Sequence, residues 1–217
     1  MSPMPDQLTP TDRTKVRRLP DRGTFDRDVV EAIIDEAYIA HVGFVVDGSP
    51  RVLPMTYGRD GDHLYLHGSV GNAMLRALSE GEACVTITLL DGLVLARSAF
   101  HHSMNYRSVV LLGRPTMVED EAAKAHAFDV IVEHVLRGRS TVARPNNESE
   151  LRKTLVLQLE ITEGSAKVRT GGPIDDAEDM DLPVWAGVVP LRLTAGEPVQ
   201  DPDQAIDGLP VPVPDRV

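Results

Sequence analysis

The chain has 217 residues, of which 42% are hydrophobic, and a formal net charge of −11 at pH 7. This composition allows a core of ordinary size, and the length fits one domain with extensions. The acidity is concentrated at one end, because residues 174–217 contain ten acids and two bases. Without a cluster of Lys and Arg, the sequence excludes a nucleic-acid-binding surface.

Other sequence features narrow the class of protein further. The single cysteine, Cys84, excludes an internal disulfide and a multi-cysteine metal site, and its place in the apolar run "CVTITLL" predicts a buried, inert thiol. The first residues, "MSPMPDQLTPTDRTKV", have no apolar signal region, and no apolar run approaches the roughly 20 residues that span a bilayer. We therefore expect a cytoplasmic protein with no membrane partner and no nucleic-acid partner.

The first third of the chain predicts an arm, a helix and three strands. Residues 1–24 are polar and form the arm, which is ordered only if it docks. A helix follows in "TFDRDVVEAIIDEAY", capped by Thr24 or Asp26. The next three runs, "HVGFVVDG", "RVLPMTYGRDG" and "HLYLHG", are of β type. Asp-Gly pairs at 47–48 and 60–61 predict that these runs form an antiparallel meander.

The middle of the chain alternates helices and strands. "NAMLRALSEG" (72–81) predicts a short helix, and "DEAAKAHAFDVIVEHVLRG" (120–138) predicts a longer one whose histidines lie at the surface. "ACVTITLLDGLVLARS" (83–98) predicts two strands around a turn at its Asp-Gly pair. "YRSVVLLGRPTMVED" (106–120) predicts one long strand, bent at its glycine and proline. A loop at "ARPNNESE" and two strands, "TLVLQLEIT" and "SAKVRTG", follow.

About seven short strands with interposed helices predict an α+β fold built on an antiparallel barrel or sandwich. We divide the chain into an N-terminal arm (1–24), a β domain (25–172) and an acidic, proline-rich C-terminal extension (173–217). The segment "DLPVWAGVVPLRL" is an apolar island within the extension and contains the one tryptophan of the chain. We expect this island to dock, either on its own fold or on a partner.

The stretch "LYLHGSVGNAML" (64–75) begins as an alternating strand and ends as the start of a helix. The first-turn N–H groups of a helix are unpaired and carry partial positive charge, so glycines that let the backbone approach create an anion site. Gly68, Ser69, Gly71 and Asn72 predict a phosphate site of this kind, with His67 on the strand before it. The alternative is a capped turn with no ligand and a structural histidine.

Two other stretches gather polar side chains on predicted strands. In "SPRVLPMTYG", Arg51 lies on the same face as Leu53 and Met55, and Pro54 lies on the opposite face with Val52. A proline there indicates an edge strand or a break that exposes backbone groups to a planar heterocycle. "SMNYRSVVLLGR" brings a tyrosine, an arginine and a serine together at 106–108. The alternative for that stretch is a solvated strand end.

The order of three segments, "PRVLPMTYG", "DGDHLYLHGS" and "NYRSVVLLGR", resembles the pyridoxamine 5′-phosphate oxidase-like flavin-binding proteins. The branch is that of the flavin-nucleotide-binding and nitroimidazole-resistance reductase-like proteins. The resemblance covers about residues 17–193 and includes "AKVRTGGPIDD" and "PVWAGVVPL". It implies an antiparallel FMN-binding split β-barrel with peripheral helices, a homodimer, and flavin in a groove at the subunit interface.

The resemblance also implies where the cofactor lies. The isoalloxazine would lie along residues 51–55, the ribityl phosphate would lie at 67–72, and residues 106–108 would approach the cofactor. The implied cofactor-binding residues are Arg51, Val52, Leu53, Pro54, Met55, His67, Gly68, Ser69, Asn72, Tyr106, Arg107, Ser108 and Trp185.

Two departures argue against pyridoxamine-phosphate oxidation itself. The stretch "GSVGNAML" has no base before Arg76, where the oxidases carry a basic phosphate clamp, and the C-terminal region is acidic. We expect FMN held by neutral donors, or FAD in its place. The predicted function is an oxidoreductase that reduces a small electron-poor substrate, such as a nitro compound or quinone, with NADH or NADPH as donor. His67 is the predicted catalytic residue, because its ordinary pKa near 6.5 suits proton delivery.

Two alternative functions stay open from sequence alone. The first is a flavin-binding protein without enzymatic activity. The second is a haem-binding split barrel, in which His63 and His67, on one face of a strand, combine with His41. The adjacent His101 and His102 would point to opposite faces of a strand, so they predict no metal site.

Overall fold

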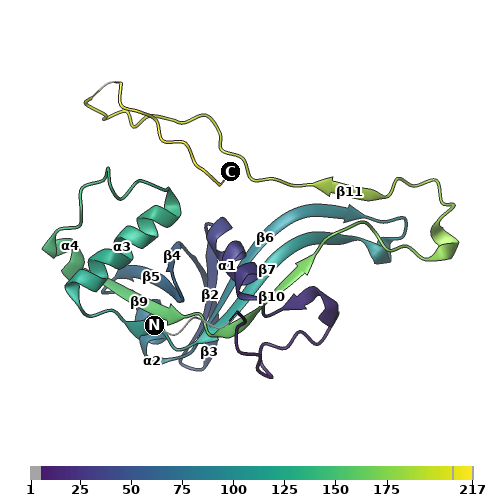
Figure 1. Cartoon of the computed structure of the whole chain (residues 1–217), viewed down its shortest axis with the longest axis horizontal. Helices are drawn as coiled ribbons and strands as arrows, with labels where there is room; N and C mark the ends of the chain where they lie inside the picture. The colour runs from purple at the N-terminus through teal and green to yellow at the C-terminus, as the bar shows by residue number, and fades with distance from the viewer. Residues whose placement is uncertain (1–5, 207, 217) are drawn as a thin grey trace.

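The computed structural model describes residues 6–206 and 208–216, and it confirms the predicted α+β, antiparallel split β-barrel (Figure 1). One sheet of seven strands has the order β1-β10-β7-β6-β2-β3, with β11 added to β6, and a second sheet has the order β4-β5-β9-β8. The strands are β1 (Gly23–Thr24), β2 (Ala40–Val46), β3 (Ser49–Met55), β4 (Tyr57–Asp60), β5 (His63–Ser69), β6 (Ala83–Leu95), β7 (Ser103–Gly113), β8 (Thr116–Met117), β9 (Thr154–Glu160), β10 (Glu163–Arg169) and β11 (Gly187–Pro190).

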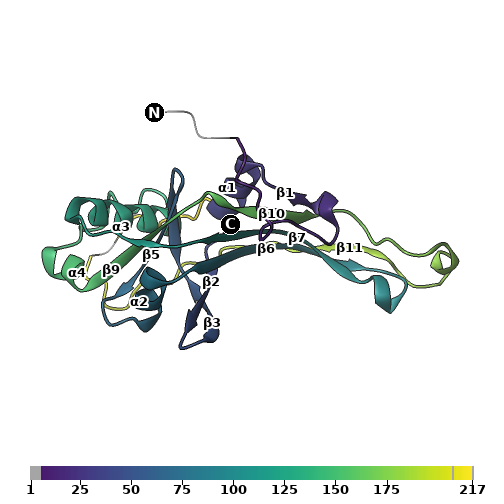
Figure 2. The same cartoon turned by 90° about the horizontal axis from the view of Figure 1, so that it is seen from below.

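The α-helices of the described chain lie around these sheets, as Figure 2 shows from below. They are α1 (Arg27–Glu36), α2 (Ala73–Glu80), α3 (Glu121–Val135) and α4 (Glu148–Arg152). The predicted cap of α1 is confirmed at Asp26, which accepts a hydrogen bond from the N–H of Asp28 at 3.0 Å; Asn72, predicted as a phosphate donor, caps α2. The predicted loop at 143–150 is wrong at its end, because Asn147 and Glu150 form a capping box that starts α4.

Both Asp-Gly joints of the predicted three-strand meander are confirmed, but its middle run is wrong as a single strand. Strands β2 and β3 pair as a hairpin, and β4 and β5 pair as another, but β3 and β4 belong to different sheets. The chain changes sheet at Thr56, next to Tyr57, which is fully buried. One predicted β run is therefore two strands, and it divides the barrel into its two sheets.

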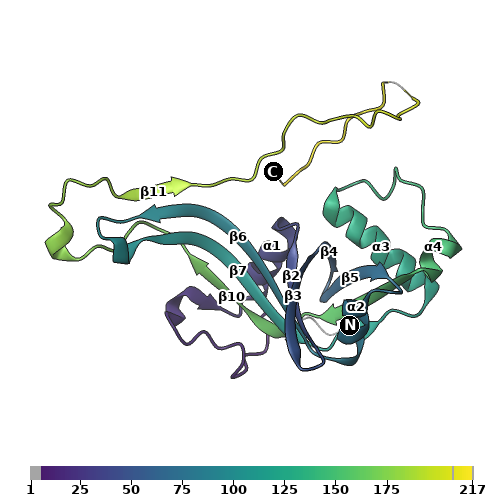
Figure 3. The same cartoon turned by 180° about the vertical axis from the view of Figure 1, so that it is seen from behind.

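The predicted turn at Asp91-Gly92 is also wrong, because β6 runs through this pair as one strand beside β7. The register shifts between Leu90 and Gly92, so the pair forms a bulge and not a hairpin. A Cβ at Gly92 would lie 3.1 Å from a side-chain carbon of Val188 on β11. The glycine thus lets the neighbouring strand approach, and the long β6–β7 hairpin projects as an arm (Figure 3).

Both ends of the chain dock on the sheets. In the N-terminal arm, Leu8 is 1% exposed, and Arg13 forms ion pairs with Glu163 and Glu82. The first five residues of the predicted arm lie outside the described part of the chain. In the extension, the predicted docking of the apolar island is confirmed, because β11 pairs with the far half of β6. Beyond β11 the chain runs back across the molecule toward α1 (Figure 1).

The main core lies between α1, α2 and the inner faces of both sheets, and a smaller cluster lies under α3. Cys84 is half-buried, so the predicted full burial of this thiol is wrong. Within the described ranges, none of the helices has the length and apolarity needed to cross a membrane.

Candidate functional site

The predicted phosphate turn lies where β5 ends and α2 begins, and its backbone donors are already occupied. The N–H of Val70 donates to the carbonyl of Lys153 at 3.0 Å, and the N–H of Gly71 donates to Ser69 Oγ at 3.2 Å. Asn72 Oδ1 accepts from the N–H groups of Met74 and Leu75. The donors left for an anion are therefore mainly side-chain groups: the Ser69 hydroxyl and the Asn72 amide.

Two basic residues lie at this turn that sequence reasoning did not assign to it. Arg76 folds back from α2, and its Nε and Nη2 donate to the carbonyl of Val70 at 3.0 and 2.7 Å. Lys153 is held beside the turn because its carbonyl accepts from Val70 and the next residue pairs with Ser69 across β5 and β9. Arg76 thus brings positive charge to the turn from one helical turn away, and the backbone of Lys153, distant in sequence, lies beside the turn.

Gly68 allows the tight geometry of this turn. A Cβ at this position would lie 2.9 Å from the Cδ1 of Leu75 and 3.1 Å from the amide nitrogen of Asn72. The close approach holds the Asn72 side chain over the end of β5. A glycine is required here for packing and not for an unusual φ angle.

His67 is half-buried on the outer face of β5. Its ring lies edge-on to Phe128 of α3, with 5.5 Å between ring centroids, and Nδ1 is buried without a hydrogen-bond partner. Burial lowers the pKa of this imidazole, so the ring is neutral at pH 7. A neutral histidine with a free ring nitrogen can act as a ligand to a metal-containing group.

The predicted isoalloxazine strand, β3, is the edge of the larger sheet, in agreement with Pro54. Arg51, Val52, Leu53 and Pro54 are exposed, and Met55 is half-buried. Val52 and Leu53 are 62% and 46% exposed. Apolar side chains on an unpaired strand edge are a surface that a ligand or a second chain can cover.

The predicted residues of β7 have different partners. The Arg107 guanidinium binds Glu36 of α1 and also binds Asp91 through two bonds of 3.0 and 2.7 Å. These two carboxylates raise the pKa of Arg107. Ser108 donates to the carbonyl of Lys167 at 3.4 Å, and Tyr106 is half-buried between β6 and β10. Arg107 is therefore largely committed to carboxylates within the chain.

The predicted site residues lie in four separate places in one chain. His67, Gly68, Ser69 and Asn72 are together at the β5–α2 turn, whereas β3 and the 106–108 segment are on the larger sheet. Trp185 is 65% exposed, and its ring lies against Gly187, which pairs with Leu95 at the far end of β6. A single chain therefore does not close these four parts into one pocket.

The histidines predicted for a metal or haem site do not converge. His41 is on β2 in the larger sheet, whereas His63 and His67 are on β5 in the smaller sheet. Among residues 6–206 and 208–216, no group of three or more His, Cys, Asp or Glu side chains is arranged to hold a metal ion. His101 and His102 lie in and beside a short 3-10 helix, and His101 contacts Asp176.

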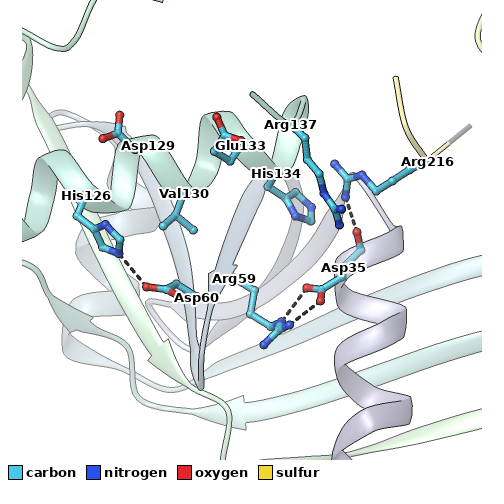
Figure 4. Close-up of a pocket in the computed structure, with 10 residues that line it drawn as sticks. All are labelled: Asp35, Arg59, Asp60, His126, Asp129, Val130, Glu133, His134, Arg137 and Arg216. Carbon is cyan, nitrogen blue, oxygen red and sulfur yellow. Dashed lines mark hydrogen bonds and ion pairs between the residues drawn. The ribbon is translucent and has the colours of Figure 1, made fainter. Parts of the chain in front are cut away.

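A second polar cluster gathers at the C-terminal end of α1, around a cavity of about 410 Å³ (Figure 4). Tyr57 donates to the carbonyls of Ile34 and Ala37 at 2.5 and 3.0 Å, and His134 Nε2 bonds the Ala37 carbonyl at 2.8 Å. Arg216 donates to the carbonyl of Asp35. The orphan carbonyls of the last helical turn are thus satisfied by three other elements.

His134 contradicts its predicted surface position, because it is 9% exposed. Burial, and then the charge of Arg216, lower its pKa to about 4. The other histidine of α3, His126, is exposed as predicted and binds Asp60 at 2.8 Å. Arg59 pairs with Asp35 at 2.5 Å, whereas Arg216 bonds only the Asp35 carbonyl, and its Nε and Nη2 are buried without a hydrogen-bond partner among the described residues.

The family model described as pyridoxamine 5′-phosphate oxidase matches residues 26–168, and no curated protein matches the chain. Among solved structures, the chain is similar to the flavocytochrome Anf3 from Azotobacter vinelandii. The identity is 42%, the TM-score is 0.87, and the alignment covers 96% of each chain.

Two other solved structures are similar to this chain. The FAD and haem binding protein from Mycobacterium smegmatis has 38% identity and a TM-score of 0.84, over 88% of this chain and 94% of that one. A 5-nitroimidazole antibiotic resistance protein from Bacteroides thetaiotaomicron, itself described as putative, has 27% identity and a TM-score of 0.58, over 67% and 86%. These matches confirm the resemblance seen in the sequence.

Proposed function

The chain belongs to the pyridoxamine 5′-phosphate oxidase family, and from this premise we propose that it is an oxidoreductase that binds FAD and haem. The observation that carries the proposal is similarity along 96% and 88% of the chain to a flavocytochrome and to an FAD- and haem-binding protein. A flavin supplies hydride and electron transfer, and the protein supplies position and electrostatics. The substrate class is a small electron-poor compound, a nitro compound or a quinone, with NADH or NADPH as donor.

The β5–α2 turn fits the phosphate of a flavin. The Ser69 hydroxyl and Asn72 amide are neutral donors, and Arg76 and Lys153 add the positive charge that the turn itself lacks. Since the backbone N–H groups of the turn already have acceptors, these four side chains would hold the phosphate. The exposed strand β3 would then lie along the ring system, with Leu53 and Val52 as apolar contacts.

His67 is the residue that would hold a haem group. Its ring is neutral, and its buried Nδ1 has no partner among the described residues. Coordination of iron needs an unprotonated nitrogen, and the ring is already in that state at pH 7. With a lowered pKa, His67 is also a poor reservoir of protons, so we do not retain it as general acid. Its role in the proposal is to hold haem.

The first experiment is a visible spectrum of the purified protein, with chromatography of the flavin released by acid. We expect flavin absorption, FAD in the released fraction, a haem Soret band, and bleaching of the flavin by NADH or NADPH. A protein without flavin that also takes up neither FAD nor FMN would disprove the proposal. Bound flavin with no turnover of nitro or quinone acceptors would leave a flavin-binding protein without enzymatic activity.

Matched variants separate the two cofactor sites. We expect Arg76→Ala to weaken FAD binding about tenfold, since it removes a charge-assisted contact. Arg114→Ala is the control, because Arg114 is exposed and contacts only the carbonyl of Glu80, at 3.5 Å. His67→Ala should lose the Soret band and keep the flavin. Loss of flavin alone in His67→Ala would contradict the assignment of this residue to haem.

We propose that the active form is a homodimer with flavin at the interface. Support comes from β3, whose Val52 and Leu53 are exposed on an unpaired edge, and from the separation of the four predicted site segments in one chain. Size-exclusion chromatography with light scattering tests this. Leu53→Lys should shift the protein toward monomer and lower its flavin content, whereas Val142→Lys, at a 74% exposed loop position, should change neither.

A further inference from the structure

A second cavity, of about 1120 Å³, opens where β11 separates from β6. Strand β11 pairs with β6 from Leu95 to Gly92, and the N–H of Leu191 donates to the carbonyl of Asp91 at 3.0 Å. The tail then diverges from β6. Closer to the barrel, β2 pairs with β6 at Cys84, Val85 and Thr86. Among the described strands, none pairs with this side of β6 over residues 87–90.

Leucines line two sides of this wedge among its charged residues. Leu89 and Leu90 of β6 face it from one side, and Leu191 and Leu193 of the diverging tail face it from the other. Leu90 is 45% exposed and Leu193 is 70% exposed. Leucines on opposite walls of a cavity form a slot suited to a flat apolar group.

The charged groups of the wedge mostly cancel within the chain. Arg107 binds Glu36 and Asp91, Arg137 binds Asp215 at 3.1 Å, and Arg216 donates to the carbonyl of Asp35. Neither Arg192 nor Arg216 has an ion pair with a carboxylate in the described ranges. Arg216 is half-buried and held by the Asp35 carbonyl and the Tyr38 ring, whereas Arg192 is exposed at the rim. The wedge thus presents one exposed guanidinium beside its leucines.

We propose that the wedge is a binding site for a neutral, planar aromatic compound with an electron-rich oxygen, such as a nitro or quinone oxygen. The ring would lie between Leu90 and Leu193, and the oxygen would accept from Arg192. The lining has four carboxylates and four arginines, and this balance disfavours a polyanion such as a dinucleotide, because no net positive charge is left for several phosphates. The tail segment at 191–193 and its terminal contacts at 215–216 form the roof of this site. The inference does not require flavin or haem to be bound.

The test is a saturation-transfer NMR titration of the purified full-length protein with para-nitrobenzyl alcohol, without any reductant. Benzyl alcohol, which lacks the nitro oxygens, is the ligand control. Leu193→Asp is the test variant, and Leu209→Asp is its control, because Leu209 is a 54% exposed tail leucine that does not line the wedge. Arg192→Gln tests the proposed contact to oxygen.

We expect saturable binding to the native protein and to Leu209→Asp, with an affinity about tenfold weaker in Leu193→Asp and about fivefold weaker in Arg192→Gln. Benzyl alcohol should bind the native protein more weakly than the nitro compound does. The two compounds should bind Arg192→Gln with equal affinity. No binding at all, equal binding by Leu193→Asp and the native protein, or displacement of the nitro compound by adenosine monophosphate would overturn the proposal.

Discussion

The buried His134 makes the stability of the protein depend on pH. Its imidazole donates to the Ala37 carbonyl, lies 4.3 Å from the Tyr57 ring centroid, and is close to the charges of Asp35, Arg59 and Arg216. Burial and the charge of Arg216 lower its pKa to about 4 in the folded state, whereas an unfolded histidine titrates near 6.5. Between these values the unfolded chain binds more protons than the native one, so the free energy of unfolding falls as pH falls.

The size of this effect follows from the two pKa values. With about 4 folded and about 6.5 unfolded, the free energy of unfolding falls by about 2 kcal/mol between about pH 7.5 and about pH 5. Almost none of this loss occurs above about pH 7.5, because both states are then neutral. The loss reaches its limit below the folded pKa, where the imidazole is protonated in both states.

The assay is urea unfolding at both pH values, followed by far-UV circular dichroism, for the native protein and for His134→Gln. The glutamine amide can donate to the Ala37 carbonyl in place of Nε2 but cannot titrate. Because His67 and the carboxylates are common to both proteins, the difference between their pH dependences isolates His134. Equal pH dependences, or a native protein more stable at about pH 5, would refute a neutral, buried imidazole.

Three further predictions concern packing and capping. Gly58→Ala should lower the free energy of unfolding by about 3 kcal/mol, because the new Cβ would lie 2.8 Å from the Ile131 Cα. Gly172→Ala is the control and should leave stability unchanged, since no atom lies within 4 Å of its new Cβ. Thermal unfolding measures both variants. Tyr57→Phe should cost about 1–2 kcal/mol by leaving two carbonyls without the hydroxyl, as urea unfolding will show. Arg216→Ala should speed trypsin cleavage of the tail at 192, which gel electrophoresis follows with the β domain as internal standard.

Local signals in the sequence predicted the elements that depend on neighbours along the chain. Asp26 and Asn72 begin helices because their side chains accept N–H groups two residues ahead, an interaction that sequence alone contains. The Asp47-Gly48 turn is of the same kind, since both residues have positive φ, 51° and 75°. Such features need no information about the rest of the fold.

Predictions failed where a distant strand decided the conformation. The Asp91-Gly92 pair has the composition of a hairpin turn, yet neither residue has positive φ, and Gly92 serves to admit β11, nearly a hundred residues later in the chain. His134 was misplaced for a similar reason: its burial depends on the end of α1, which no local pattern near residue 134 reveals.

The predicted phosphate turn shows the same difference between local signals and contacts from distant segments. The sequence points to His67, Ser69 and Asn72 because they lie close together in one strand-to-helix joint. It treated Arg76 as too far along the chain, although one helical turn brings its guanidinium back onto the Val70 carbonyl. The position of Lys153 beside the turn could not be predicted locally, since it results from the pairing of β5 with β9. The folded chain therefore brings one base, Arg76, back onto a turn whose linear sequence lacks a basic residue.

The end of α1 connects the tail to the cavities. This helix ends at an extended Ala37 and not at a glycine, so its last carbonyls depend on Tyr57, His134 and Arg216 from three other elements. Arg216 also lies 4.3 Å from the Tyr38 ring centroid, which adds a cation–π contact. Because both cavities include this arginine in their walls, a tail that detaches would weaken the helix cap and open both cavities together.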